Sequence, residues 1–138
     1  MVYQTPEQRL QNDLTQLIAV PPFQSLPVTM VELPEFRSLV QNKGVLILDA
    51  RSSAFYQLGH VPGALNLARD NFAVDYLRLR SKIGKSSERP IVVYCSGGDC
   101  HDSKMVAQAL MSLGFSGVEV FRGGWDEWTG AGLPQQRG

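Results

Sequence analysis

Residues 91–103 read IVVYCSGGDCHDS and carry the clearest structural signal in the chain. Ile91–Tyr94 form a continuous apolar run, which is typical of a strand that is buried on both faces. Cys95 ends this run, and a loop with two adjacent glycines leads from it into a helix predicted from about Ser103 to Leu113. Strand, loop and helix in this order predict a unit of a parallel α/β sheet, in which sites lie at the carboxyl ends of strands.

The segment from Cys95 to Ser103, here called the cysteine loop, has the features of an anion-binding turn. Its glycines let the backbone turn so that several N–H groups can point inward. The following helix adds unpaired N–H groups and the positive end of its dipole. Such surroundings favour the thiolate of Cys95, the reactive form of cysteine. The residues predicted to bind an anion are Ser96, Gly97, Gly98, Asp99, Cys100, His101, Asp102 and Ser103.

Several residues of the cysteine loop have alternative interpretations. Asp102 or Ser103 is the expected N-cap of the helix. His101 is either a cation that lowers the pKa of Cys95 or an exposed residue. Cys100 either resolves an oxidised or persulfidated Cys95 by forming a disulfide or has no role. Cys95 itself is either a nucleophile or a small buried apolar residue, and the loop alone does not separate sulfur transfer from phosphate-ester or arsenate chemistry.

Short apolar runs and helical patterns alternate along the rest of the chain, which predicts a parallel sheet with helices on both faces. The predicted strands are Val28–Val31, Val45–Leu48, Leu65–Leu67, Ile91–Tyr94 and Val118–Phe121. Further helices are predicted from Pro34, over Ser53–Leu58, from Phe72 to Leu79 and around Trp125 and Trp128.

The N-terminal residues predict a separate element. Residues 1–20 have the pattern of an amphipathic helix, whose apolar face packs on the domain or contacts a partner. Pro21 and Pro22 end it. The predicted division is therefore an N-terminal helix and linker over residues 1–27 and one α/β domain over residues 28–138.

The composition excludes several classes of function. Thirteen basic and thirteen acidic residues give a formal net charge of zero, so no electrostatic signature of nucleic-acid or anionic-membrane binding is present. No apolar run reaches the roughly 18 residues of a membrane-spanning helix. The N-terminus is too polar for a signal peptide, so a cytoplasmic location is expected. The chain has only two cysteines, which is no disulfide scaffold.

Four motifs, taken in order, resemble those of single-domain rhodaneses, the thiosulfate sulfurtransferases. Residues 48–51 (LDAR) resemble the D-x-R signature, and residues 59–66 (GHVPGALN) resemble the G-H-[IV]-P-G-A-x-N turn. Residues 92–95 (VVYC) resemble the strand that leads to the catalytic cysteine, and residues 123–134 resemble the G-G-x-x-x-W ending. The resemblance covers about residues 28–135 and implies a three-layer α/β/α fold with a five-stranded parallel sheet.

The resemblance also implies a reaction and its partners. Cys95 would take the outer sulfur of thiosulfate or another sulfane donor as a persulfide, and cyanide, a small thiol or a protein thiol would accept it. Loop N–H groups would stabilise the developing charge. No cofactor is implied. Asp49, Arg51 and His60 are expected to support the site, the first two through an ion pair or hydrogen bonds and His60 through a ring hydrogen bond to backbone.

The chain departs from the family pattern in the cysteine loop. Cys95 and Ser103 are spaced C-x7-S, where the family has C-x5-[ST], and Cys100 stands where an arginine is common. The related phosphatases and arsenate reductases need the arginine of C-x5-R, which is missing here, so that chemistry ranks low. Asp99 and Asp102 would repel a dianionic donor unless they point away. A catalytically weak redox or binding module that uses the Cys95/Cys100 dithiol is therefore the alternative. The C-x4-C-H spacing is no usual zinc pattern, and no metal is expected.

Overall fold

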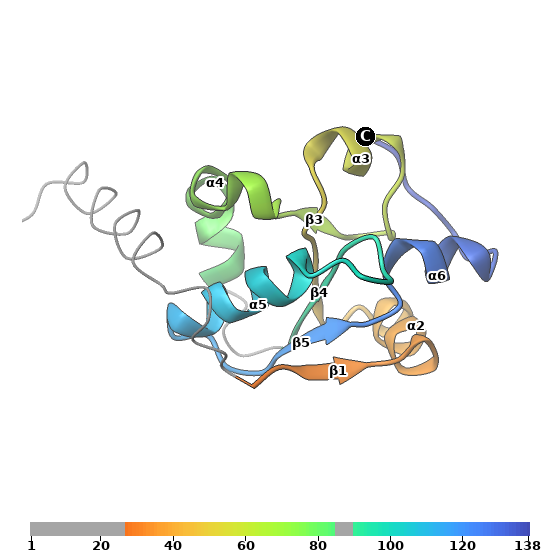
Figure 1. Ribbon diagram of the computed structural model, residues 1–138, viewed down its shortest axis with the longest axis horizontal. Coiled ribbons are helices and arrows are strands. Elements are labelled where there is room, and N and C mark those ends of the chain that lie inside the picture. Colours follow the sequence, from red (N-terminus) through yellow and green to blue (C-terminus); the bar gives the residue numbers. More distant parts are fainter. Residues whose placement is uncertain (1–26, 85–89) are drawn as a thin grey trace, which may run out of the picture.

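The computed structural model describes residues 27–84 and 90–138. The helix predicted over residues 1–20 lies outside these ranges. In the described part of the chain, strands and helices alternate along almost the whole sequence, as the apolar runs predict (Figure 1).

The strands form one five-stranded parallel sheet in the order β1-β5-β4-β2-β3. Their bounds are β1 Thr29–Val31, β2 Leu46–Asp49, β3 Leu65–Asn66, β4 Ile91–Tyr94 and β5 Val118–Phe121. All five predicted strands are confirmed, with shifts of at most one residue at the ends of the first three. β4 is the central strand, and its four residues are all buried because neighbouring strands and helices enclose it.

The helices lie on the two sides of this sheet. All but the last connect successive strands, and the last follows β5. Their bounds are α2 Leu33–Asn42, α3 Ser53–Leu58, α4 Phe72–Gly84, α5 Asp102–Ser112 and α6 Gly124–Gly130, with a short 3₁₀ turn η1 at Arg69–Asn71. α2 has Pro34 in its first turn, where the missing N–H costs nothing, and ends at Lys43 in a left-handed conformation (φ 56°). Within the described ranges, no helix is long and apolar enough to cross a bilayer.

Two apolar clusters fill the spaces on the two faces of the sheet. Along β4, Val93 points to the cluster shared with α4 and α5, whereas Val92 and Tyr94 point to the cluster shared with α2 and α6. Side chains of a strand alternate between the faces, so each strand contributes to both clusters. Phe36 and Trp128, both buried, anchor the α2/α6 side. The molecule is therefore the expected three-layer α/β/α arrangement.

Candidate active site

Cys95 follows the last residue of β4 and is only 2% exposed. Because all strands are parallel, their carboxyl ends share one edge of the sheet, and the cysteine loop lies at this edge between β4 and α5 (Figure 1). The Cys95 side chain belongs to the cluster on the α4/α5 face, together with Ala50 and Leu67. Cys95 therefore lies where the sequence predicts it, directly after the central strand.

Cys95 and Cys100 are joined by a disulfide, with their Cα atoms 6.6 Å apart. Of the two alternatives for Cys100, disulfide formation with Cys95 is therefore the one that the structure shows. A disulfide sulfur is not a nucleophile, so Cys95 must be reduced before it can react. The cradle of loop N–H groups around a free Cys95 sulfur stays a prediction, since that sulfur is bonded to Cys100 here.

Ser103 places its hydroxyl against the Cys95 sulfur. Its Oγ lies 3.2 Å from Cys95 Sγ, and Ser103 is 4% exposed. The prediction that Asp102 or Ser103 is the N-cap is wrong: α5 begins at Asp102, and His101 occupies the N-cap position without a side-chain cap hydrogen bond. The physical reason is that the Ser103 side chain points inward to the sulfur, where it can donate a hydrogen bond to a thiolate.

The acidic residues of the cysteine loop are exposed or partly exposed. Asp99 is exposed, and the Asp102 carboxylate is about half exposed, with Oδ1 4.0 Å from Arg69 Nε of η1. An ion pair with this exposure is weak, but it supplies a positive charge that the loop itself lacks. His101 is also exposed.

The start of α6 packs directly on the cysteine loop. Trp125 N donates to Cys95 O at 2.8 Å, and Asp126 N donates to Ser96 O at 2.9 Å. This approach needs glycine at Gly124, which has φ 63° and where a Cβ would lie 2.5 Å from Cys95 O. Gly124 thus lets N–H groups of α6 hold the backbone of the cysteine loop.

Asp49 and Arg51 form a buried ion pair beneath the loop. The Asp49 carboxylate is fully buried and accepts from Arg51 Nη2 at 2.8 Å and from Tyr94 Oη at 2.7 Å. Arg51 Nη2 also donates to Gly59 O at 2.6 Å, and its guanidinium lies 4.6 Å from the Trp125 ring centroid. Burial works against the charged form of Arg51, but Asp49 outweighs it, so the pKa of Arg51 is raised. The ion pair therefore ties the ends of β2 and β4 to α6, as expected of a supporting role.

His60 and Tyr56 fasten the turn before β3. His60 Nδ1 is 2.8 Å from Tyr56 O, and the two rings stack with centroids 3.7 Å apart. His60 also pairs by backbone hydrogen bonds with Gln136, which brings the C-terminal residues beside α3 (Figure 1). The predicted ring hydrogen bond to backbone is confirmed. His60 is fixed by these contacts. Across the described residues, no group of three or more His, Cys, Asp or Glu side chains is placed to hold a metal.

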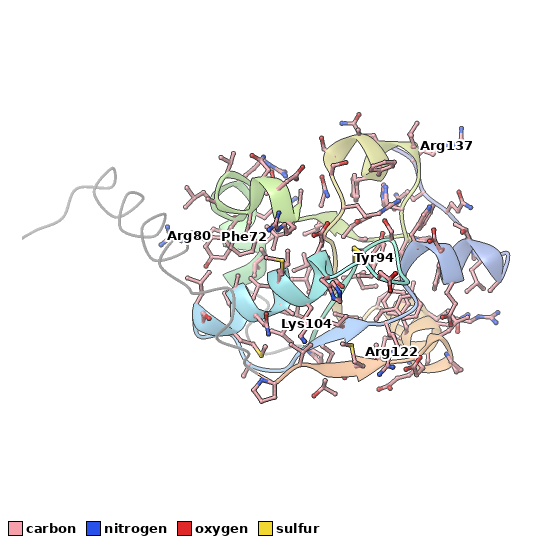
Figure 2. The ribbon with its side chains drawn as sticks, in the orientation of Figure 1. Phe72, Arg80, Tyr94, Lys104, Arg122 and Arg137 are labelled. Atoms are coloured by element: carbon pink, nitrogen blue, oxygen red, sulfur yellow. A yellow bond between two sulfur atoms is a disulfide. The ribbon has the colours of Figure 1, made fainter. Side chains whose placement is uncertain are left out.

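Tyr94, which is labelled in Figure 2, should make the free energy of unfolding depend on pH in the alkaline range. Burial, reinforced by the charge of Asp49, raises the pKa of the Tyr94 hydroxyl far above its usual value. Above about pH 10 the Tyr94 hydroxyl loses its proton in the unfolded chain but keeps it in the folded chain. The free energy of unfolding is undiminished below that pH, and above it falls by up to about 1.4 kcal/mol per pH unit. In Tyr94→Phe this dependence is absent. Denaturant unfolding from about pH 9 to 11 should show the gap between wild type and variant shrinking; a constant gap would contradict the assignment.

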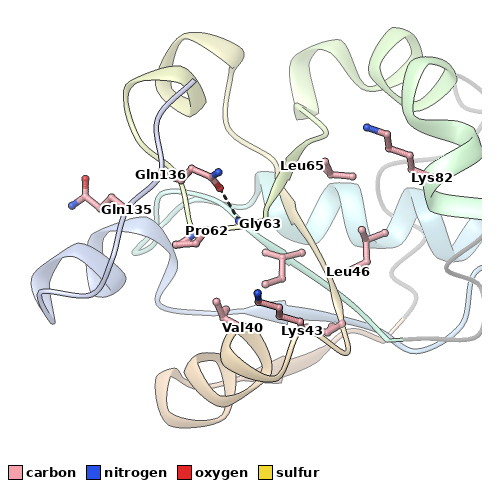
Figure 3. A pocket seen from close by; sticks show the side chains of 11 residues that line it. Val40, Lys43, Leu46, Pro62, Gly63, Leu65, Lys82, Gln135 and Gln136 are labelled. Carbon is pink, nitrogen blue, oxygen red and sulfur yellow. Dashed lines mark hydrogen bonds between the residues drawn. The ribbon is translucent and has the colours of Figure 1, made fainter.

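Several hollows open on the described surface, among them one of about 270 Å³ that is lined by Ser52, Ser53, Ala68, Asp70, Asn71 and Asp75. A cleft of about 410 Å³ lies between α3, the cysteine loop and α6, and it is called the α3/α6 cleft below. Its lining comprises Arg51, Phe55, Leu58, Gly59, Ser96, Trp125, Asp126, Thr129 and Gln135. A larger hollow of about 880 Å³ lies along the outer edge of β2 and β3, between Lys43 and Lys82 (Figure 3). Of these three hollows, the α3/α6 cleft is the one lined by a residue of the cysteine loop, Ser96.

Phe55 and Leu58 are the site residues that the sequence did not single out. Both are exposed on α3 and line the α3/α6 cleft. Their three-residue spacing on a short helix is the usual pattern of a buried face, which is why no sequence signal marked them. Trp125 lines the cleft, whereas Trp128 is buried in the core.

Comparisons with known proteins agree with this arrangement. The model of the rhodanese-like domain family matches residues 32–131. Thiosulfate sulfurtransferase GlpE of Actinobacillus pleuropneumoniae serotype 5b is 31% identical over 101 residues, covering 70% of this chain and 82% of the relative. Thiosulfate sulfurtransferase/rhodanese-like domain-containing protein 3 of Mus musculus is 27% identical over 103 residues, and the match spans 69% of this chain and 64% of that protein.

Among solved structures, the rhodanese-like domain of the Anabaena protein Alr3790 superposes with a TM-score of 0.65 at 26% identity, covering 80% of each chain. The family match extends over most of the described chain. It includes the cysteine loop and the motif segments at residues 48–51 and 59–66. The chain therefore belongs to the family of rhodanese-like domains.

Proposed function

We propose that this protein is a sulfurtransferase that moves a sulfane sulfur from thiosulfate or another persulfide donor to a thiol or cyanide acceptor through a persulfide of Cys95. One observation carries the proposal. Cys95 ends the central strand, nearly buried, with the Ser103 hydroxyl 3.2 Å from its sulfur and the first turn of α5 beside it. Family membership supports the sulfurtransferase class.

The reaction balances in two steps. The Cys95 thiolate attacks the outer sulfur of thiosulfate, the S–S bond of the donor breaks, and sulfite leaves with the electron pair. The acceptor, a thiolate or cyanide, then attacks the outer sulfur of the persulfide, and Cys95 leaves again as a thiolate. No net oxidation occurs and no cofactor takes part. This is covalent catalysis by an activated cysteine.

The surroundings of Cys95 suit the charges in these steps. The Ser103 hydroxyl can donate to the thiolate, and the N-terminus of α5 places a positive dipole end beside it. Loop N–H groups in the reduced form would stabilise the persulfide anion. Asp99 is exposed, and the carboxylate of Asp102 pairs with Arg69, so neither carboxylate is buried with the Cys95 sulfur. A reaction that starts from a free thiol suits a reducing compartment, which favours the cytoplasm.

The test combines two measurements on fully reduced protein. Thiocyanate formation from thiosulfate and cyanide should exceed the uncatalysed rate, and intact-mass analysis after incubation with the donor alone should show one added sulfur atom. Peptide mapping should place this atom on Cys95. If neither signal occurs with thiosulfate, polysulfide or an organic persulfide as the donor, the protein is not a sulfurtransferase.

The disulfide favours one second candidate function, a redox-responsive module that uses the Cys95/Cys100 dithiol. In Cys100→Ser, mild oxidant should no longer form an intraloop disulfide, and recovery of sulfur transfer by dithiothreitol after oxidation should be lost or much slower. Without a resolving thiol, Cys95 is exposed to irreversible oxidation. Thiol titration and activity recovery after graded hydrogen peroxide measure this effect, with Cys95→Ser as the thiol-count control. Recovery equal to that of wild type would rule out a resolving role.

A further inference from the structure

The α3/α6 cleft has an apolar wall that nothing in the described chain covers. Phe55 is 59% exposed and Leu58 is 73% exposed, and both contribute to the lining. Large apolar side chains with this exposure are few: among the described residues the others are Met30 and Val74, which stand outside the cleft. Two exposed apolar side chains and an indole ring line the same concave site. This grouping indicates a surface that binds a ligand, and chance exposure explains it less well.

Trp125 forms the opposite wall and connects the cleft to the nucleophile. Its indole packs over Gly59 and over the Arg51 guanidinium, and its backbone N–H donates to the carbonyl oxygen of Cys95. Ser96, the residue that follows Cys95, also lines the cleft. A molecule held between Phe55 and Trp125 would therefore lie next to the backbone that carries the reactive sulfur.

The charges of the cleft disfavour anions. Its one cationic lining residue is Arg51, whose guanidinium is neutralised by Asp49 and further bonded to Gly59 O. Asp126, an exposed carboxylate, lies on the rim. A dianion gains no free cation here and meets a negative charge, whereas a neutral apolar group buries surface without losing hydrogen bonds.

We infer that the α3/α6 cleft binds the sulfur acceptor, and that this acceptor is a small organic thiol with a neutral apolar group about the size of a phenyl ring. The cleft volume of about 410 Å³ lies within the range of small-molecule sites. Phe55, Leu58 and Trp125 hold the apolar group and determine specificity. The inference rests on the proposed sulfurtransferase function and names the substrate class of its second half-reaction.

The chemistry of this step is balanced. The acceptor thiolate attacks the outer sulfur of the Cys95 persulfide, a new S–S bond forms in the product persulfide, and the bond to Cys95 Sγ breaks with its electron pair on Cys95. The proton released when the acceptor thiol ionises balances the proton taken up by the product. No oxidant or reductant enters.

The kinetic test compares two primary thiols of similar acidity. Protein loaded with the Cys95 persulfide is mixed with excess benzyl mercaptan or 2-mercaptoethanol, and loss of the added sulfur is followed by intact mass. Benzyl mercaptan should react about tenfold faster at equal subsaturating concentration, because one apolar group in a hydrophobic pocket contributes about 10- to 200-fold. In Phe55→Ser/Leu58→Ser this preference should vanish. Val74→Ser, equally exposed on α4, is the matched control and should keep it.

A binding test stands apart from turnover. The chain has two tryptophans, so its two indole N–H signals separate the cleft from the core. Benzyl alcohol, which carries the same apolar group without a thiol, should shift the Trp125 signal in wild type and Val74→Ser but not in Phe55→Ser/Leu58→Ser. The Trp128 signal, hydrogen-bonded to Pro134 O, should stay in place.

The outcomes are distinguishable. An unmoved Trp125 signal in wild type, equal rates for the two thiols, or a preference that survives in the double variant overturns the inference. If no persulfide forms at all, the proposed function fails, and the Trp125 titration alone decides whether the cleft takes an apolar ligand.

Discussion

Cys95→Ser should reduce thiocyanate formation to the uncatalysed rate, a loss on the order of 1,000-fold or more. The serine hydroxyl is almost entirely protonated at neutral pH and is a poor nucleophile for sulfur, whereas a thiolate beside the positive end of α5 is a strong one. The substitution is nearly isosteric in a position that is 2% exposed, so the fold should persist. Thiocyanate assays and intact mass on the same preparation measure both half-reactions.

Cys100→Ser is the matched control for that experiment. It removes one thiol from the same loop but leaves Cys95 in place, so fully reduced Cys100→Ser should keep the added sulfur and most of the sulfur transfer. Circular dichroism of both variants shows whether a loss comes from unfolding. Transfer that persists in Cys95→Ser, or that disappears equally in both variants, would contradict the assignment of Cys95 as the nucleophile.

Asp49→Ala should lower the free energy of unfolding by about 3–5 kcal/mol. The substitution leaves the buried Arg51 guanidinium without its carboxylate partner and takes the acceptor from the Tyr94 hydroxyl. Removing one member of a buried pair costs this much because an uncompensated charge remains away from water. Domains have a total stability of only about 5–15 kcal/mol, so the effect should be plain in urea unfolding.

Glu32→Ala is the control, because it removes the acidic member of an ion pair at the surface. Glu32 pairs with Arg122 at 3.2 Å, but both side chains are more than 60% exposed, so the cost should stay within about 0–1 kcal/mol. Asp49→Asn keeps the shape of the side chain and one hydrogen-bonding oxygen but removes the charge. Its loss of unfolding free energy should therefore lie between those of Asp49→Ala and Glu32→Ala. Equal costs for Asp49→Ala and Glu32→Ala would show that the Asp49–Arg51 pair does not support the fold.

Most of the fold could be predicted from local patterns. β4 and β5 have the predicted bounds because each is a short strand, mostly apolar, set off by residues that do not extend it. The start of α5 could not be predicted to the residue, because Ser103, a good N-cap by type, is turned to the Cys95 sulfur. That choice depends on a neighbour eight positions away, across the turn of the loop.

Part of the candidate site could likewise be predicted from local sequence, and part could not. The strand, its terminal Cys95 and the following loop are contiguous, so their order is sufficient to place the nucleophile at the carboxyl edge of a parallel sheet. The pairing of Cys95 with Cys100 was one of two alternatives until the loop conformation brought the sulfurs together. Which backbone atoms contact the cysteine loop depends on α6, whose Trp125 lies thirty positions further along.

Periodicity is a property of neighbouring residues, and it was enough for the strands, the helices and the position of Cys95 after a buried strand. The Asp49–Arg51 pair and the five-stranded sheet were expected from the resemblance to rhodaneses. The disulfide, the inward turn of Ser103 and the α3/α6 cleft required the folded chain. Exposure of Phe55 and Leu58 depends on which distant segments pack against α3, and no local pattern carries that information. The proposed specificity of this site accordingly depends on long-range packing, whereas the proposed nucleophile could be recognised from the local sequence.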